Sequence, residues 1–249
     1  MRKLLLAAAT TVLLAAPAIA ADMARPVMKA PIAPVPVYNW SGFYIGVDGG
    51  WAGSRQDVNW PFSTLPVTSF THDKDSGFLS AHVGVQWQFG NFVLGVEGSG
   101  VFLSSDLEIG SPQSGCPDTA FTCQASVDQL WTVGPRAGVV VANNWLVYGT
   151  GGFASGRVRS RSFTTATGVV FDDLSHRDSG WFIGGGLEYM FANWGNHAWI
   201  FGAEYRHIDL GTHRFLSVSG VPDTNTRDID TTVDLVAARL SLKWNWMGR

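Results

Sequence analysis

Charged side chains occur singly within otherwise apolar stretches of this 249-residue chain, and the acidic and basic members are roughly balanced in number. A charge that is buried without a partner costs several kcal/mol, so opposite charges in an enclosed space should pair. The chemistry that this set predicts is therefore mutual ion pairing. Its members are Asp48, Glu97, Arg136, Glu188, Glu204, Arg206, Arg239 and Lys243.

Histidine offers a second kind of chemistry. His72, His176 and His213 fall in three different long polar stretches, where they could ligate a metal or a haem, or could simply be solvated. His207 and Asp209 lie together and His82 lies apart, but no Ser-His-acid set has a spacing that compels a catalytic triad. We expect no catalytic residue, no metal and no cofactor.

An alternation with a period of two identifies the elements that carry the charges. In residues 79–89, apolar side chains that end in Trp87 and Phe89 alternate with polar or small ones, and the pattern resumes in residues 92–102 after the Gly90-Asn91 turn. Such alternation places the two sets on opposite faces of a strand. An apolar face backed by a polar or charged one is typical of a hairpin that contacts lipid outside and lines a polar lumen.

The same pattern recurs along the chain and predicts eight strands. Their connections alternate in length, with short ones at 90–91, 142–144 and 192–197 and long polar ones around 53–76, 105–127, 160–178 and 211–230. Short periplasmic turns and long outer loops are typical of a transmembrane antiparallel up-and-down β-barrel in a bacterial outer membrane. A soluble β-sandwich is the alternative. The expected strands cover residues 42–51, 79–89, 92–102, 131–141, 145–155, 181–191, 199–208 and 232–246.

Aromatic residues gather at both ends of the expected strands, as in the interfacial girdles of membrane barrels. Pro135 is the exception to the pattern, because proline cannot donate to a strand ladder; we expect a bulge or a lost hydrogen bond there. The turn-end aromatic residues are Trp40, Trp87, Phe89, Phe92, Trp145, Phe191, Trp194, Trp199, Trp244 and Trp246; Trp51, Phe102, Trp131 and Trp181 are at the loop end.

The interior of a barrel of about eight strands is just wide enough for side chains to fill. The charged set therefore has two interpretations, a packed polar core or the selectivity lining of a pore, and we favour the core. Arg157, Arg159 and Arg161 lead out of a strand; they could bind lipopolysaccharide phosphates or end in solvent.

The beginning of the chain predicts export. Residues 1–20 have the basic start, apolar core and Ala18-Ile19-Ala20 cleavage site of a signal peptide; residues 21–39 form a proline-rich linker, and residues 40–249 the barrel. Because export leads to an oxidising compartment, we expect a disulfide between Cys116 and Cys123. A net charge of −3 gives no basic surface for nucleic acid.

Several short segments in this order resemble the outer-membrane immunogenic, porin-like barrel family of alphaproteobacteria. They are residues 38–46 (YNWSGFYIG), 92–98 (FVLGVEG), 146–152 (LVYGTGG) and 184–189 (GGGLEY). The resemblance implies an eight-stranded barrel in a Gram-negative outer membrane, exposed at the cell surface and without an enzyme active site. Two departures are the ending Met247-Gly248-Arg249 after Trp246, where the family usually ends on an aromatic residue, and Pro135.

The sequence thus predicts a structural, surface-exposed role, immunogenic or adhesive, with a largely plugged polar interior. A small passive channel is the alternative, followed by an outer-leaflet enzyme or a surface protein that binds haem or metal. The expected partners are outer-membrane lipid and lipopolysaccharide, the barrel-insertion machinery and surface ligands of the loops.

Overall fold

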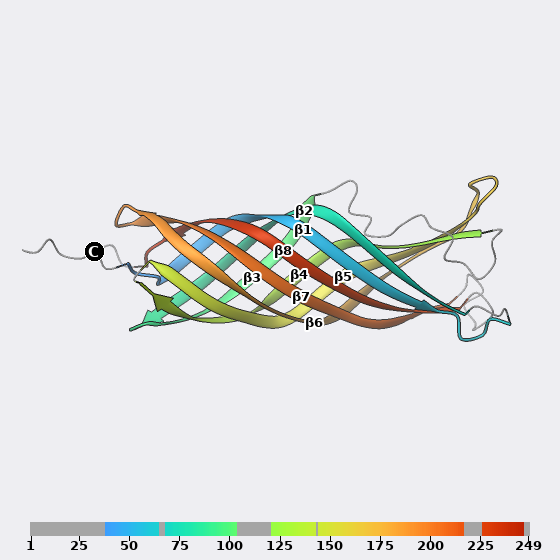
Figure 1. The fold of residues 1–249 in the computed structure, drawn as a ribbon, viewed down its shortest axis with the longest axis horizontal. Coiled ribbons are helices and arrows are strands. Elements are labelled where there is room, and N and C mark those ends of the chain that lie inside the picture. The colour runs from blue at the N-terminus through green and yellow to red at the C-terminus, as the bar shows by residue number, and fades with distance from the viewer. Residues whose placement is uncertain (1–37, 65–67, 104–120, 143, 217–225, 247–249) are drawn as a thin grey trace, which may run out of the picture. The chain divides into compact units, whose positions relative to one another are not determined.

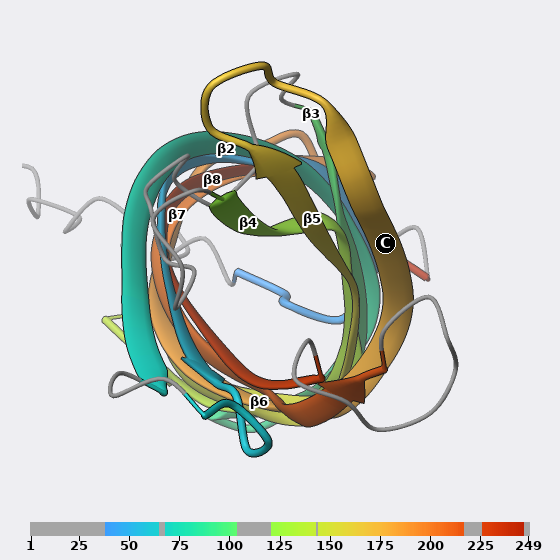
Figure 2. The same ribbon diagram turned by 90° about the vertical axis from the view of Figure 1, so that its right-hand side faces the viewer.

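A computed structural model describes residues 38–64, 68–103, 121–142, 144–216 and 226–246. Eight antiparallel strands form one closed sheet in which β8 pairs with β1, so the predicted all-β up-and-down barrel is confirmed (Figures 1 and 2). Within the described residues, no helix is long and apolar enough to cross a membrane. The strands are β1 Gly42–Asn59, β2 Ser69–Phe89, β3 Phe92–Leu103, β4 Phe121–Val141, β5 Trp145–Thr164, β6 Val170–Asn193, β7 His197–Phe215 and β8 Arg227–Trp244.

The barrel has a turn end, where β2–β3, β4–β5 and β6–β7 connect, and a loop end, where the other connections lie. The expected bounds of the long loops were wrong, since β1 runs on to Asn59 and β5 and β6 are separated only by residues 165–169. In these extensions the outward positions are polar, and the inward positions mix apolar side chains such as Val58, Val158 and Ile229 with polar ones such as Gln56 and Ser160. The polarity that suggested loops therefore belongs to strands whose outer face meets water.

The middle of the barrel carries an apolar outer face, as the alternation predicted. Ile45, Val83 and Ile183 are exposed there, and Trp51, Trp131 and Trp181 are exposed where that apolar face ends toward the loop end. Trp40 corrects the expected turn-end girdle. Its side chain is fully buried, because residues 38–41 cross the turn-end mouth of the barrel, where the blue segment is visible in Figure 2.

Pro135 interrupts one ladder without a bulge. β3 and β4 remain in register through Val96 and Pro135, but the β4–β5 ladder lacks Gly134 and Pro135 and resumes at Arg136 in the same register. The lost pairing was one of the two expected outcomes. The Thr150 hydroxyl donates to the Pro135 carbonyl oxygen at 3.1 Å across this gap.

Among the residues that the structure describes, two seams of the barrel open toward the loop end. The β3–β4 ladder ends at Gly100 and Trp131, and the β6–β7 ladder ends at Trp181 and Asp209. Beyond these pairs β4, β5 and β6 continue as one group, and β7, β8, β1 and β2 continue as another (Figure 1). The inner faces of the two groups contribute to one apolar cluster that includes Val158, Phe215 and Ile229.

Candidate functional site

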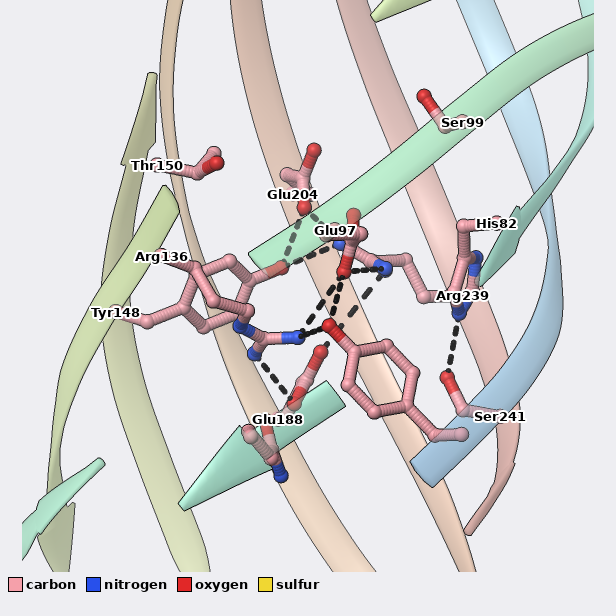
Figure 3. Close-up of polar contacts among 12 residues, drawn as sticks. His82, Glu97, Ser99, Arg136, Tyr148, Thr150, Glu188, Glu204, Arg239 and Ser241 are labelled. Carbon is pink, nitrogen blue, oxygen red and sulfur yellow. Dashed lines mark hydrogen bonds and ion pairs between the residues drawn. The ribbon is translucent and has the colours of Figure 1, made fainter. Parts of the chain in front are cut away.

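A buried polar network crosses the middle of the barrel and receives a side chain from every strand (Figure 3). Four carboxylates and three guanidinium groups make its ion pairs, and tyrosine, histidine and hydroxyl groups complete the hydrogen bonds. The contributors in strand order are Asp48 and Tyr44, His82, Glu97, Arg136, Tyr148, Glu188, Glu204 and Arg206, and Arg239.

Arg136 on β4 connects two carboxylates. Its Nη1 lies 3.1 Å from Glu97 Oε2 and its Nη2 lies 2.8 Å from Glu188 Oε2. The guanidinium carbon lies 3.9 Å from the centre of the Tyr148 ring, a cation–π contact. Nη1 also donates to the Tyr44 hydroxyl at 2.9 Å. These contacts compensate a charge that is almost completely buried.

Arg239 on β8 is the most highly connected cation of the network. Its Nε lies 3.2 Å from Asp48 Oδ1 and its Nη2 lies 2.8 Å from Glu97 Oε2, while Nη1 contacts Glu204 and donates to the Tyr148 hydroxyl at 2.8 Å. A planar fork of donors suits such multiple recognition of carboxylates. One guanidinium thus joins β8 to β1, β3, β5 and β7.

Arg206 occupies the loop side of the network. It pairs with Glu204 and lies 3.4 Å from Glu97, and its Nη1 donates to Ser99 at 2.6 Å and Thr132 at 2.7 Å. Seven of the eight charged residues singled out from the sequence therefore meet in one cluster. Lys243 is the eighth; it is buried at the turn end and contacts the Ser41 carbonyl oxygen and Asn245, with no carboxylate partner among the described residues.

Each of the two tyrosine rings lies over a glycine directly across the ladder. Tyr44 pairs with Gly84 and Tyr148 with Gly186. A Cβ atom at Gly84 would lie 2.3 Å from Tyr44, and one at Gly186 would lie 2.6 Å from the Tyr148 hydroxyl oxygen. Neither tyrosine was singled out from the sequence, and the glycines opposite them are the signal that could have identified both as inward-facing.

The structure also contains a chain of contacts from a serine through a histidine to an aspartate, which the sequence spacing did not reveal. Ser241 Oγ lies 2.8 Å from His82 Nε2, and His82 Nδ1 lies 2.9 Å from Asp48 Oδ1. This is the connectivity of a hydrolase triad. Ser241 is only 2% exposed, however, and Asp48 also contacts Arg239. A substrate carbonyl has no approach to this serine, so the arrangement serves the network.

The two candidate groups at the rim, His207 and Asp209, contact different partners. His207 Nδ1 lies 2.8 Å from Asp234 Oδ1, which also accepts a hydrogen bond from Tyr205 at 2.6 Å. Asp209 accepts instead from the backbone N–H of Gly211 at 2.8 Å. His207 and Asp209 therefore do not act together, and among the described contacts no serine joins them.

Apolar layers lie above and below the charged network. Toward the loop end the interior holds Phe78, Phe182 and Leu210, and toward the turn end it holds Leu146 and Met190 beneath Trp40. The expectation of a polar inner face thus fails outside the central belt. A cavity beside Arg206 and Arg239 measures about 20 Å³, enough for roughly one water molecule.

The remaining sequence candidates lie toward the loop end. His176 and His213 were expected in separate loops, but they lie on β6 and β7 and their rings are stacked 3.7 Å apart. His72 belongs to β2, and its side chain is outside the described residues. Cys116 also lies outside them, so the disulfide with Cys123 stays a prediction.

A closed antiparallel sheet with an apolar outside and paired charges inside defines a transmembrane β-barrel. The chain matches the family described as outer membrane protein beta-barrel domain over residues 6–238, and it belongs to that family. It is an outer-membrane protein.

The resemblance to the immunogenic, porin-like group is confirmed by two relatives. The 31 kDa outer-membrane immunogenic proteins of Brucella melitensis and Brucella suis are each 28% identical over 254 residues, which cover 98% of this chain and all of theirs. Among solved structures, OprG of Pseudomonas aeruginosa has a TM-score of 0.39 at 12% identity and covers 81% of this chain and 96% of its own. The protease OmpT of Escherichia coli has a TM-score of 0.41 at 7% identity, with coverages of 82% and 97%. The assignment depends on the family match and not on these two structures.

Proposed function

We propose that this protein is a structural, surface-presenting barrel whose interior does not form a continuous water channel, and that it is not an enzyme. The observation that carries the proposal is the network to which all eight strands contribute, with apolar layers on both sides of it. Ions would have to displace paired buried charges, at a cost of several kcal/mol for each charge left without a partner.

Planar-bilayer recording tests this proposal. We expect no steady conductance from the wild-type protein. Tyr148→Ala, which removes an inward ring that contacts Arg136, should introduce brief openings, whereas Tyr205→Ala on the outer face should behave like wild type. Stable open channels in most wild-type insertions would instead support the passive channel, which is the alternative reading of the charged lining.

Surface presentation can be tested at two comparable turns. Gly168 and Gly195 both have positive φ angles, +69° and +77°, and lie in short connections at opposite ends of the barrel. In intact cells, an epitope tag inserted at Gly168 should bind antibody and one at Gly195 should not. The opposite result would contradict the proposed orientation. The description of the Brucella relatives as immunogenic agrees with an exposed loop end.

We further propose that arginines on the outer face of the β5–β6 extension contact lipopolysaccharide phosphates. Arg159 and Arg161 lie 3.6 and 3.1 Å from Asp173, but Arg157 lies directly opposite Arg177, a like-charge pair that an anion would stabilise. This pair is four residues beyond the Phe153–Trp181 pair, or roughly 13 Å along the strand. That distance from the aromatic girdle places the two arginines at the level of the lipid headgroups.

The test compares lipid A with its dephosphorylated form. Lipid A should raise the unfolding temperature of the wild-type protein more than dephosphorylated lipid A does. The Arg157→Gln/Arg177→Gln variant should lose that difference, whereas Arg214→Gln, whose arginine is already bidentate on Asp228, should keep it. Equal responses of all three proteins would refute the proposed contact.

Signal cleavage after Ala20 stays a prediction that N-terminal sequencing of the mature protein can check.

A further inference from the structure

Two histidines and an aspartate converge on the inner face of the loop-end extension. His213 Nδ1 lies 3.2 Å from Asp178 Oδ1, and His176 Nε2 lies 3.8 Å from the same oxygen. All three ligand atoms lie within 4.8 Å of one another. We propose that His176, Asp178 and His213 bind a first-row divalent transition-metal ion such as Zn²⁺. This inference does not depend on whether the barrel interior conducts.

The distances fit tetrahedral coordination. With metal–ligand bonds of about 2.0–2.2 Å, neighbouring ligand atoms of a tetrahedral site lie about 3.4 Å apart. The two measured distances, 3.2 and 3.8 Å, lie on either side of that value. Two imidazoles and one carboxylate suit Zn²⁺ and neighbouring ions of its row, and three protein ligands leave one position for water.

The surroundings of the three side chains allow an ion to enter the site. The His176 and His213 rings are stacked 3.7 Å apart with 13° between their planes, so the exposed His176 ring must rotate out of the stack for both nitrogen lone pairs to point at one ion. The side chain of Asp178 is 9% exposed and that of His176 is 51% exposed, so an ion can enter from the His176 side.

A β-bulge brings His213 into the site. Along β7 the inward positions are even-numbered through Leu210, and the register with β8 shifts between Asp209 and Thr212, where Gly211 has a φ of +71°. After the shift the odd-numbered His213 and Phe215 face inward. A regular strand would have pointed His213 outward, away from Asp178. Bulges that redirect a side chain in this way are common beside functional sites.

The site lies where β6 and β7 lack ladder pairing. Their ladder ends at Trp181 and Asp209, so Asp178 and His213 face each other across an open seam. An ion held by both strands would replace the missing backbone hydrogen bonds with coordination bonds. Metal binding should therefore order the loop end of this seam as well as occupy it.

The experiment uses the detergent-folded mature protein, freed of metal, with Zn²⁺ titrated by calorimetry and Co²⁺ followed by its visible absorption. We expect one ion per chain. His213→Ala and Asp178→Asn should each weaken binding roughly tenfold or more, because even outer-shell changes at metal sites cost that much. The matched control is His207→Ala, which removes an outward histidine of the same strand and should leave binding unchanged.

Folding of each variant is checked by its heat-dependent migration in gels, and amide hydrogen exchange provides a second measurement. Zn²⁺ should slow exchange in residues 176–178 and 211–215 of the wild-type protein and not in His213→Ala. Absence of binding by the wild-type protein, or equal affinity in folded His213→Ala and Asp178→Asn, would overturn the site. Binding without slower exchange would overturn its role at the seam.

Discussion

Replacing Arg239 by methionine tests the physical basis of the interior. The substitution keeps an unbranched apolar stem and removes a guanidinium that contacts Asp48, Glu97 and Glu204. Arg239 is 2% exposed, so water cannot take its place without rearrangement of the network. Removing one partner of a buried ion pair costs about 3–5 kcal/mol, because the remaining charge stays buried without compensation. We expect the free energy of unfolding to fall by about that amount.

The assay is urea-induced unfolding in lipid vesicles, read as a change of midpoint at constant slope. The matched control is Arg214→Met, which removes an exposed arginine from a bidentate pair with Asp228 and should change the midpoint much less. Adding Glu97→Gln to Arg239→Met should restore part of the loss, since Arg136 and Arg206 then face three carboxylates of the network instead of four. Equal losses of unfolding free energy for Arg239→Met and Arg214→Met would refute the reasoning that burial makes the ion pairs of this network strongly stabilising.

Three further predictions concern other parts of the barrel. Trp40→Ala should lower the free energy of unfolding by about 3–5 kcal/mol, measured by the same urea assay, because it empties the turn-end layer. Gly186→Val should cost about 1–3 kcal/mol by overpacking against Tyr148, which a lower melting temperature would reveal. The hydrogen bond from Arg214 lowers the pKa of Asp228. The Arg214–Asp228 pair therefore stabilises the fold above the ordinary aspartate pKa, and this stabilisation is lost as pH falls through the lowered value. The difference in unfolding free energy between wild type and Asp228→Asn, measured by the same urea assay, should shrink between pH 7 and pH 3.

The fold could be predicted in detail from the alternation alone. The turns at 90–91 and 142–144, the outward Ile45 and Val83 and the inward Asp48 and Glu97 all follow from a period of two in a sheet that separates lipid from its interior. The strand extensions could not be recognised in the same way. Beyond the girdle the outer face meets water and carries polar residues, while the inner face holds both apolar and polar ones, so the alternation that marks the membrane-spanning part is lost.

The position of His213 shows a second limit. Its parity along β7 predicts an outward side chain, and only the bulge before it reverses that direction. The glycine at position 211 permits the bulge, but glycines are frequent throughout this chain, so a glycine alone does not indicate a bulge. The meeting of His213 with His176 and Asp178 therefore required the three-dimensional structure.

Within the regular, membrane-spanning part of the strands, the sequence by itself determined the face on which the side chains lie, because neighbouring positions alternate between two environments that accept different chemical types. It selected Glu97 and Arg239 as interior charges but not as partners, since 142 residues separate them. Which charges pair was decided by the closure and stagger of the sheet, which set the height of every inward residue, that is, its position along the barrel axis. The same closure brought Ser241 to His82 and left Lys243 apart, because contact across a barrel depends on height and not on sequence distance.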